Sequence, residues 1–257
     1  METNDQKKNI STLHQLTRDS KFKFRCHKEI SCFTKCCSGI KIVLTPYDIL
    51  RMKKRLNMTS GDFLLKYTFP ETLEPSGLPV ATLKMQEDEN KSCPFVTSGG
   101  CTIYSDRPAT CRYYPIGFAM IKEENADKKE EFFFFVKEDH CRGFEEDKEW
   151  TVQSWRDDQE PDLYDRMNKD WTEILMKKQT MGPVEIPDKS LQLFFMVSYD
   201  LDQFRRFVFE SSFLEKYEIP ETFIEKMRNN DEELQRFGLR WLKSTLFGEK
   251  FFQEKRS

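Results

Sequence analysis

Eight cysteines, all within the first 141 residues of a 257-residue chain, constrain this protein more than any other feature. Soft thiolates gathered in one part of a chain are typical ligands of structural zinc and of iron–sulfur clusters. The sequence therefore predicts a thiolate-bound metal centre. Its candidate ligands fall in two tight clusters and one later position: Cys26-x5-Cys32-x3-Cys36-Cys37, then Cys93-x7-Cys101-x9-Cys111, then Cys141.

Disulfide bonding is the alternative use of so many cysteines. Disulfide frameworks belong mostly to short secreted chains that cannot build an adequate core. This chain is 38% hydrophobic and 14% aromatic, and it is long enough to bury a core without them. Its polar start, METNDQKKNISTLHQLTRDS, lacks the apolar segment of an export signal. We therefore expect reduced, metal-bound cysteines in a cytoplasmic protein.

Composition narrows the possible partners. No apolar stretch approaches a membrane-spanning helix, which needs about 20 residues. The net charge of −3, with 33% charged residues of both signs, argues against a nucleic-acid-binding surface. Neither GxGxxG nor GxxxxGK[ST] occurs, so a dinucleotide or P-loop site is not expected. The expected partner is a metal ion or cluster, with no nucleic acid and no membrane.

Hydrophobic patterns indicate an α+β, predominantly helical protein in three parts. Residues 1–20 form a polar N-terminal arm, residues 21–147 a cysteine-cluster domain, and residues 148–257 an all-helical region packed on it. Four segments predict short antiparallel strands, the last two paired as a hairpin: Ile40–Leu44, Val80–Met85, Tyr114–Lys122 and Glu131–Lys137.

Helix signals are clear at several places. One helix should begin at Pro46 with Thr45 as its N-cap, and another at Ser60. Behind Pro161, apolar residues recur at helical spacing. Asp231 is the expected cap of the last helix. Further helices are predicted over four ranges: 189–199, 201–209, 220–228 and 232–246.

Cysteine spacing bears on the identity of the metal. Structural zinc commonly takes C-x2–4-C pairs, and only Cys32-x3-Cys36 fits, so a zinc finger is disfavoured. Cys93-Pro94 is similar to the Cys-Pro that ends bacterial ferredoxin runs. In an extended segment, Cys36 and Cys37 would point to opposite sides and could serve different metals. Eight thiolates suffice for two four-thiolate centres, or for one cluster together with cysteines that have another function.

Charged and imidazole side chains flank the cysteines. Arg107 and Arg112 bracket Cys111, and such guanidinium groups could offset the negative charge of a four-thiolate centre by hydrogen bonds. The alternative is that they are ordinary surface residues. His27 and His140 are each next to a cysteine, but the thiolates can fill the first shell, so neither histidine is included among the ligands.

Several motifs resemble the YkgJ-type cysteine-cluster proteins, also called the zinc- or iron-chelating domain family. The first motif is wider here than the family's C-x2-C-x2-C-C, and this departure affects Cys26. His140–Gly143 and the Trp150–Trp171 segment are similar to a longer branch of the family. The similarity covers roughly residues 22–145 and includes, besides the first cysteine motif, these segments: Leu44–Ile49, Gly61–Leu64, Cys93–Phe95, Cys101–Tyr104 and Arg107–Pro115.

The resemblance implies a zinc or, in better agreement with the spacing, an iron–sulfur centre such as [4Fe–4S], held by these cysteines. Its role would be structural or electron transfer. Flagellin lysine methylase has this cysteine signature, so an iron–sulfur-dependent protein-modifying enzyme is an alternative, although the sequence contains no recognisable catalytic motif. An interaction protein that uses the metal as a structural staple is a third possibility.

A shared centre makes demands on the fold. Metal–thiolate bonds are about 2.3 Å long, so the ligands of one site must approach one another. We expect this of five cysteines: Cys32, Cys36, Cys93, Cys101 and Cys111. Residues 22–145 should rely on the metal for their order, whereas the helices of residues 160–246 can bury a core of their own.

Overall fold

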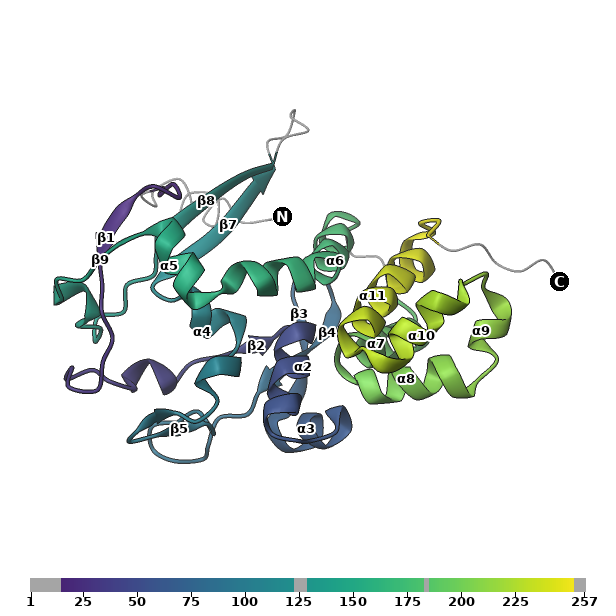
Figure 1. Ribbon diagram of the computed structural model, residues 1–257, viewed down its shortest axis with the longest axis horizontal. Helices are drawn as coiled ribbons and strands as arrows, with labels where there is room; N and C mark the ends of the chain where they lie inside the picture. Colours follow the sequence, from purple (N-terminus) through teal and green to yellow (C-terminus); the bar gives the residue numbers. More distant parts are fainter. Residues whose placement is uncertain (1–14, 123–128, 183–184, 252–257) are drawn as a thin grey trace.

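The computed structural model describes residues 15–122, 129–182 and 185–251. Within these ranges the chain forms ten α-helices and nine short strands, which confirms the predicted α+β, predominantly helical fold. Figure 1 shows the cysteine-bearing segments and most of the strands at one end and the helices of residues 188–247 at the other. The long helix α6 (Pro161–Thr180) and the sheet that contains residues 78–83 lie between them. Most of the predicted N-terminal arm, residues 1–14, lies outside the described residues.

All the strands pair antiparallel, in four small sheets. The three-stranded sheet has β4 (Leu78–Leu83) between β2 (Val43–Leu44) and β3 (Thr68–Leu73). The predicted hairpin is confirmed as β7 and β8, with Ile116 opposite Phe135. The remaining strands, with those of the hairpin, are β1 (Lys21–Lys23), β5 (Val96–Thr97), β6 (Gly100–Cys101), β7 (Ile116–Lys122), β8 (Lys129–Phe135) and β9 (Glu149–Thr151).

Helix α2 (Pro46–Arg55) begins where the sequence predicts. The Thr45 side chain accepts a hydrogen bond from the Asp48 amide at 3.2 Å, and the Asp48 carboxylate accepts one from the Thr45 amide at 2.8 Å. This reciprocal capping box satisfies two backbone donors at the helix start. The other helices of this half are α3 (Ser60–Tyr67), α4 (Ala109–Tyr113) and α5 (Val152–Gln159).

Four of the C-terminal helices lie within a residue or two of the predicted ranges, and the short helix of residues 213–216 was not predicted. The predicted cap of the last helix is wrong: Asn230, not Asp231, accepts hydrogen bonds from the amides of Glu232 and Glu233. An asparagine oxygen reaches these free donors as well as a carboxylate does. Asp231 is instead the first helical residue and pairs with Arg205. These helices are α7 (Asp188–Tyr199), α8 (Leu201–Glu210), α9 (Phe213–Lys216), α10 (Glu221–Asn229) and α11 (Asp231–Phe247).

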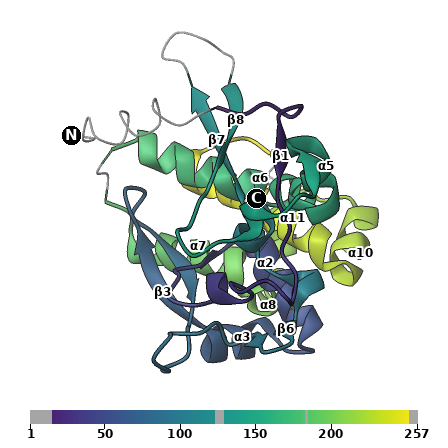
Figure 2. The same ribbon diagram turned by 90° about the vertical axis from the view of Figure 1, so that its left-hand side faces the viewer.

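Two separate hydrophobic cores organise these elements. The large core joins β2, β4, α2 and α3 to α6–α8, α10 and α11, so it runs from Ile42 to Leu242 along the chain. The small core contains Phe22, Phe24, Ile116 and Trp155, among others. Figure 2 shows its elements, β1, α5 and the β7–β8 hairpin, on the same side of the molecule. The strands that carry the small core thus form a unit distinct from the three-stranded sheet.

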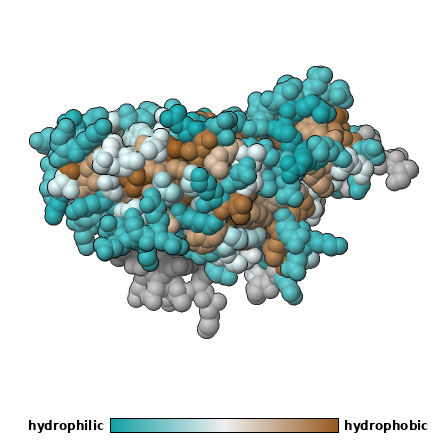
Figure 3. Space-filling view, turned by 90° about the horizontal axis from the view of Figure 1, so that it is seen from below, coloured by the Kyte–Doolittle hydropathy of each residue, from teal (hydrophilic) through white to brown (hydrophobic). Residues whose placement is uncertain are grey.

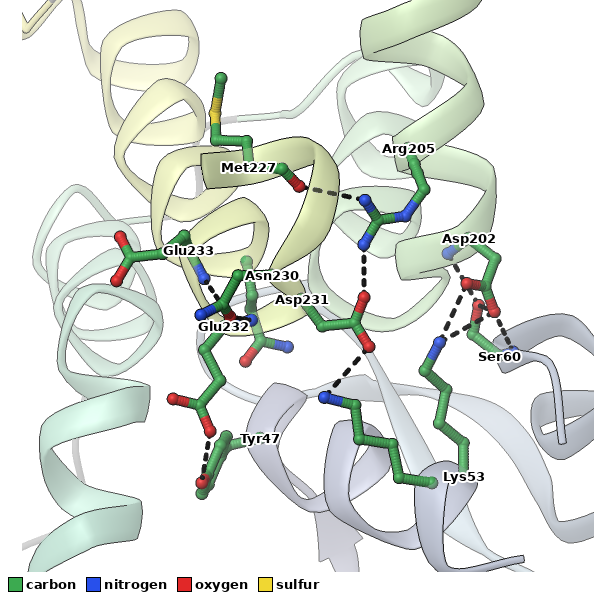
Figure 4. A network of polar contacts seen from close by, with 12 residues as sticks. Tyr47, Lys53, Ser60, Asp202, Arg205, Met227, Asn230, Asp231, Glu232 and Glu233 are labelled. Carbon is green, nitrogen blue, oxygen red and sulfur yellow. Dashed lines mark hydrogen bonds and ion pairs between the residues drawn. The ribbon is translucent and has the colours of Figure 1, made fainter. Parts of the chain in front are cut away.

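A polar network ties α2 and α3 to the C-terminal helices (Figure 4). The Asp202 carboxylate accepts hydrogen bonds from the buried Lys53 ammonium at 2.9 Å and from the Ser60 amide at 2.6 Å. On the other side, the Tyr47 hydroxyl donates to Glu232 at 3.1 Å. These contacts bridge segments about 140 or more positions apart in the sequence.

Removing the Asp202 carboxylate should destabilise this junction. Asp202→Ala leaves the Lys53 ammonium, which is only 6% exposed, without its partner, and we expect a loss of about 2 kcal/mol in the free energy of unfolding at pH 7. Burial opposes ionisation of Asp202, but the hydrogen bonds from Ser60 and Lys53 outweigh it and lower the pKa of the carboxyl. Denaturant unfolding of this variant and of the exposed control Glu218→Ala measures the effect.

The pH dependence of that loss has a definite sign. A carboxyl with a lowered pKa in the folded state stabilises the protein above its unfolded pKa of about 4 and loses this contribution as pH falls through the folded value. The difference between the wild type and Asp202→Ala should therefore shrink below about pH 4. A difference that stays constant down to pH 3 would contradict the assignment.

No helix among the described residues is both long enough and apolar enough to span a bilayer. In Figure 3, apolar side chains form an irregular band along one face, between hydrophilic margins. The most exposed large apolar side chain of the described residues is Leu65, at 80%.

Candidate metal centre

The cysteines lie on loops and short elements rather than on long helices. Cys26 and Cys32 follow β1, and Cys36 and Cys37 close a 3₁₀ turn (Lys35–Cys37). Cys93 precedes β5, Cys101 ends β6, Cys111 lies in α4, and Cys141 precedes another 3₁₀ turn. All eight are free, with Cys26 and Cys36 exposed, Cys32 buried, and the others half-buried.

The first group of thiols gathers where β1 continues beside residues 141–148. The Arg25 amide donates to the Gly143 carbonyl at 3.0 Å, which brings Cys26 to this segment. The Arg142 amide donates to Cys32 Sγ at 3.2 Å. Although Cys26 is exposed as a residue, the partial burial of its thiol raises the pKa to about 11, and the neighbouring thiols Cys36, Cys32 and Cys141 add to the effect.

A close approach of two segments makes this first group possible. A Cβ atom on Gly143 would lie 2.5 Å from the Phe24 ring, so only glycine allows the chain to pass there. The Tyr114 side chain also faces this group. Burial raises its pKa, and the nearby Cys141 and Cys36 raise it further.

The second group gathers where the segment after Cys37 pairs with the segment before Cys93. The Cys93 amide donates to the Cys37 carbonyl at 2.8 Å. Cys101 lies across the β5–β6 pair, opposite Val96. Burial raises the pKa of Cys111 to about 12, and among the neighbouring groups Cys93 raises it most. Cys93 and Cys111 also contribute to the raised pKa of Cys37.

Cys36 and Cys37 stand at the boundary between the two groups. The sequence reasoning assumed an extended segment, but the chain forms a 3₁₀ turn there, in which successive side chains diverge by about 120°. The Cys36 and Cys37 thiols nevertheless interact with each other. This contact lowers the pKa of Cys36 and, because Cys37 keeps the proton, raises that of Cys37.

Of the two arginines near Cys111, Arg107 is the one whose charge interacts with the thiols. Burial lowers the Arg107 pKa, whereas the neighbouring Cys111 and Cys101 favour its charged form. Its guanidinium donates to the Tyr104 carbonyl at 2.6 Å and to Gln159. A fixed positive charge at this position can offset thiolate charge.

Arg112 has a different function. Its side chain is 2% exposed and donates to three backbone carbonyls, those of Ser105, Arg107 and Gln159, at 2.5, 3.2 and 2.8 Å. It therefore fixes the loop before α4 against the end of α5 rather than contacting a thiol. Sequence reasoning grouped it with Arg107, since both flank Cys111.

Asp48 positions α4 and was not identified from the sequence. Besides capping α2, its carboxylate accepts a hydrogen bond from the Ala109 amide at 2.8 Å, two residues before Cys111. It is fully buried, and burial raises its pKa to about 6. The capping motif that starts at Thr45 signals Asp48 locally, but nothing in the sequence pairs it with residue 109.

Replacing Asp48 should loosen α4. Asp48→Ala removes the acceptor of two backbone hydrogen bonds and also relieves the cost of burying a carboxylate, so we expect a net loss of about 2 kcal/mol. Chemical denaturation gives this value, and thiol labelling reports the accessibility of Cys111. Asp62→Ala, at an exposed position in the first turn of α3, is the control. Equal losses in the two variants would show that the link to α4 contributes nothing.

The two histidines beside cysteines are placed differently. His27 lies between two carboxylates, with Nδ1 2.9 Å from Glu29 and Nε2 3.2 Å from Glu146. His140 lines an open hollow of about 690 Å³ next to the thiol groups. The hollow is polar and lined by residues such as Lys35, Ser38 and Ser92, which are neighbours of cysteines in the sequence; no described cysteine lines it.

The cysteine side chains are farther apart than the ligands of a bound metal ion would be. In the described ranges, no set of three or more His, Cys, Asp or Glu side chains is arranged to hold a metal ion. The donor set nevertheless has the chemistry of a thiolate centre, because each cysteine has others as neighbours. The thiols with raised pKa values must release protons when they bind metal.

Comparison with known proteins agrees with this chemistry. Residues 25–142 match the family CxxCxxCC, which is described as "Putative zinc- or iron-chelating domain". The match spans all eight cysteines and confirms the resemblance seen in the sequence. No curated protein and no solved structure matches the chain.

Proposed function

Because the chain carries a domain of the CxxCxxCC family over residues 25–142, we propose that its eight cysteines bind iron–sulfur clusters rather than zinc. Metal binding follows from the family description, which covers both zinc and iron. The irregular ligand spacing and the Cys93-Pro94 dipeptide favour iron–sulfur. When bound, such a cluster supplies one-electron redox chemistry.

One observation carries the proposal: cysteines up to 115 positions apart are brought together by folding. The Cys93 amide reaches Cys37, and the Arg142 amide reaches the sulfur of Cys32, 110 positions earlier. A chain that used its cysteines only as small apolar residues would have no reason to gather them. The ligands that we assign are Cys26, Cys32, Cys36, Cys37, Cys93, Cys101, Cys111 and Cys141.

Exposure supports electron transfer as well as a structural role. Cys26 and Cys36 are exposed, so a centre that they ligate would lie at the surface, where a redox partner can approach. Arg107 would compensate the negative charge of the more buried thiolates. The polar hollow beside them would keep one side open to solvent.

Metal analysis tests the proposal. Protein purified without oxygen should contain iron and acid-labile sulfide, and its broad absorption near about 400 nm should bleach on addition of dithionite. Stoichiometric zinc without sulfide in a colourless protein would refute iron–sulfur but keep metal binding. Absence of both metals, after reconstitution with iron and sulfide under reducing conditions, would refute the function itself.

A further inference from the structure

We propose that the eight cysteines form two separate four-thiolate centres, one from Cys26, Cys32, Cys36 and Cys141 and the other from Cys37, Cys93, Cys101 and Cys111. This inference rests on the proposed function and adds to it the number of centres and the ligands of each. Four thiolates complete either a structural zinc site or a cubane cluster, so eight divide naturally into two sets.

The two cores separate the groups. Cys93, Cys101 and Cys111 pack against the large core, which contains the three-stranded sheet and the C-terminal helices. Cys141 packs against the small core, formed around β1 and the β7–β8 hairpin. Three ligands of one proposed centre and one of the other are therefore fixed to different parts of the molecule.

Backbone contacts assign the remaining cysteines. The Cys37 carbonyl accepts from the Cys93 amide, and the Gly39 amide donates to the Lys91 carbonyl at 3.1 Å, so Cys37 runs beside the segment of Cys93. The Cys32 sulfur accepts a hydrogen bond from the Arg142 amide, and this contact places Cys32 next to Cys141. Cys26 follows Arg25, whose amide is bonded to Gly143.

Cys36 completes the first set. It is a neighbour of Cys26 and, together with Cys141, lies near Tyr114; it also lies near Cys111 of the second set, as expected of a residue at the boundary between the two. Cys36 and Cys37 are consecutive in the 3₁₀ turn and their thiols interact, so the two centres would meet at this pair, with Cys36 a ligand of the first and Cys37 of the second. Because no described set of thiols is already arranged to hold an ion, the side chains of each set must turn inward when metal binds.

The arrangement explains the otherwise unusual Cys-Cys pair. Two centres joined through adjacent ligands would be linked by one short piece of backbone. The first centre would include the two exposed cysteines, Cys26 and Cys36, and the second only half-buried ones. We therefore expect the first centre to lose its metal to a chelator before the second does.

Single substitutions in each set test the division. Full-length protein is purified without oxygen as Cys32→Ser and as Cys101→Ser, with Ser92→Ala, which removes a hydroxyl beside Cys93, as a matched control. Metal and sulfide are measured, and free thiols are alkylated with N-ethylmaleimide and mapped by mass spectrometry. Each cysteine variant should retain about half of the wild-type metal, and the control should retain all of it.

The labelling pattern is the more specific readout. Cys32→Ser should expose Cys26, Cys36 and Cys141 to alkylation while the second set stays protected, and Cys101→Ser should do the reverse. A second pair, Cys141→Ser and Cys93→Ser, must give the same two patterns, which guards against one variant that fails to fold. If a substitution in one set removes all of the metal, or if labelling spreads over both sets, the two-centre division is overturned while metal binding stands. A wild type without metal would refute the proposed function, and this inference with it.

Discussion

Removal of the metal is expected to raise amide hydrogen exchange in three segments, residues 24–39, 86–102 and 137–145, by about 100-fold or more. These segments hold seven of the eight cysteines but contain only 3₁₀ turns and two-residue strands. Metal binding can supply several kcal/mol of folding free energy, about 10 kcal/mol or more in zinc-finger peptides. Segments with so few regular hydrogen bonds depend on that contribution.

The large core should be much less affected. The sequence alone predicted loss of protection over all of residues 22–145, but β2, β4 and α2 share their core with the C-terminal helices. We therefore expect residues 42–83 to stay protected together with residues 160–246 when the metal is removed. Chelation without oxygen, followed by exchange and mass spectrometry, measures this, and the Cys36→Ser/Cys37→Ser double variant provides a chelator-free comparison.

Two outcomes would contradict this expectation. Equal loss of protection across residues 42–83 and 160–246 would mean that the molecule unfolds as one cooperative unit. No change in any segment would mean that the cysteines do not form a structural centre.

Arg112→Ala should be the most destabilising single substitution outside the cysteines that we consider. It leaves the carbonyls of Ser105, Arg107 and Gln159 without their donor and removes a cation–π contact 4.4 Å from the centre of the Tyr164 ring. Unpaired buried carbonyls are costly, so we expect a loss of about 3–5 kcal/mol in the free energy of unfolding.

The control for this prediction is Arg166→Ala, which removes an exposed arginine from the middle of α6 and should change stability by about 0.5 kcal/mol or less. Denaturant unfolding compares the two variants. A loss below about 1 kcal/mol for Arg112→Ala would show that the three carbonyls find other partners. Arg112→Lys should recover little, because an ammonium cannot span the three acceptors.

Local signals in the sequence predicted much of the fold. Thr45 and Pro46 fix the start of α2, and the hairpin and most C-terminal helices follow from alternation or helical spacing. The sequence predicted a helical region that includes α5 but no separate helix there, because only Val152 and Trp155 of its eight residues are apolar. The cap at Asn230 was misassigned, because Asn230 and Asp231 are both good capping residues and the sequence does not choose between them.

The residues of the site could be predicted from the sequence, but their arrangement in space could not. The family and the eight candidate ligands are visible in the sequence, whereas the division of the cysteines that we propose depends on pairings over long distances. The Arg142 amide donates to the Cys32 sulfur, and the Cys93 amide donates to the Cys37 carbonyl; no local pattern encodes either hydrogen bond. For the same reason, the separate functions of Arg107 and Arg112 emerge only when their acceptors are known.

X-ray absorption at the iron and zinc edges of protein purified without oxygen tests the central claim most directly, because it reports the metal and its ligands together. The account predicts an iron edge, with sulfur as the only nearest neighbour and a second shell of iron. A zinc edge with four sulfur neighbours and no iron, or a metal bound mainly by nitrogen and oxygen, would contradict it.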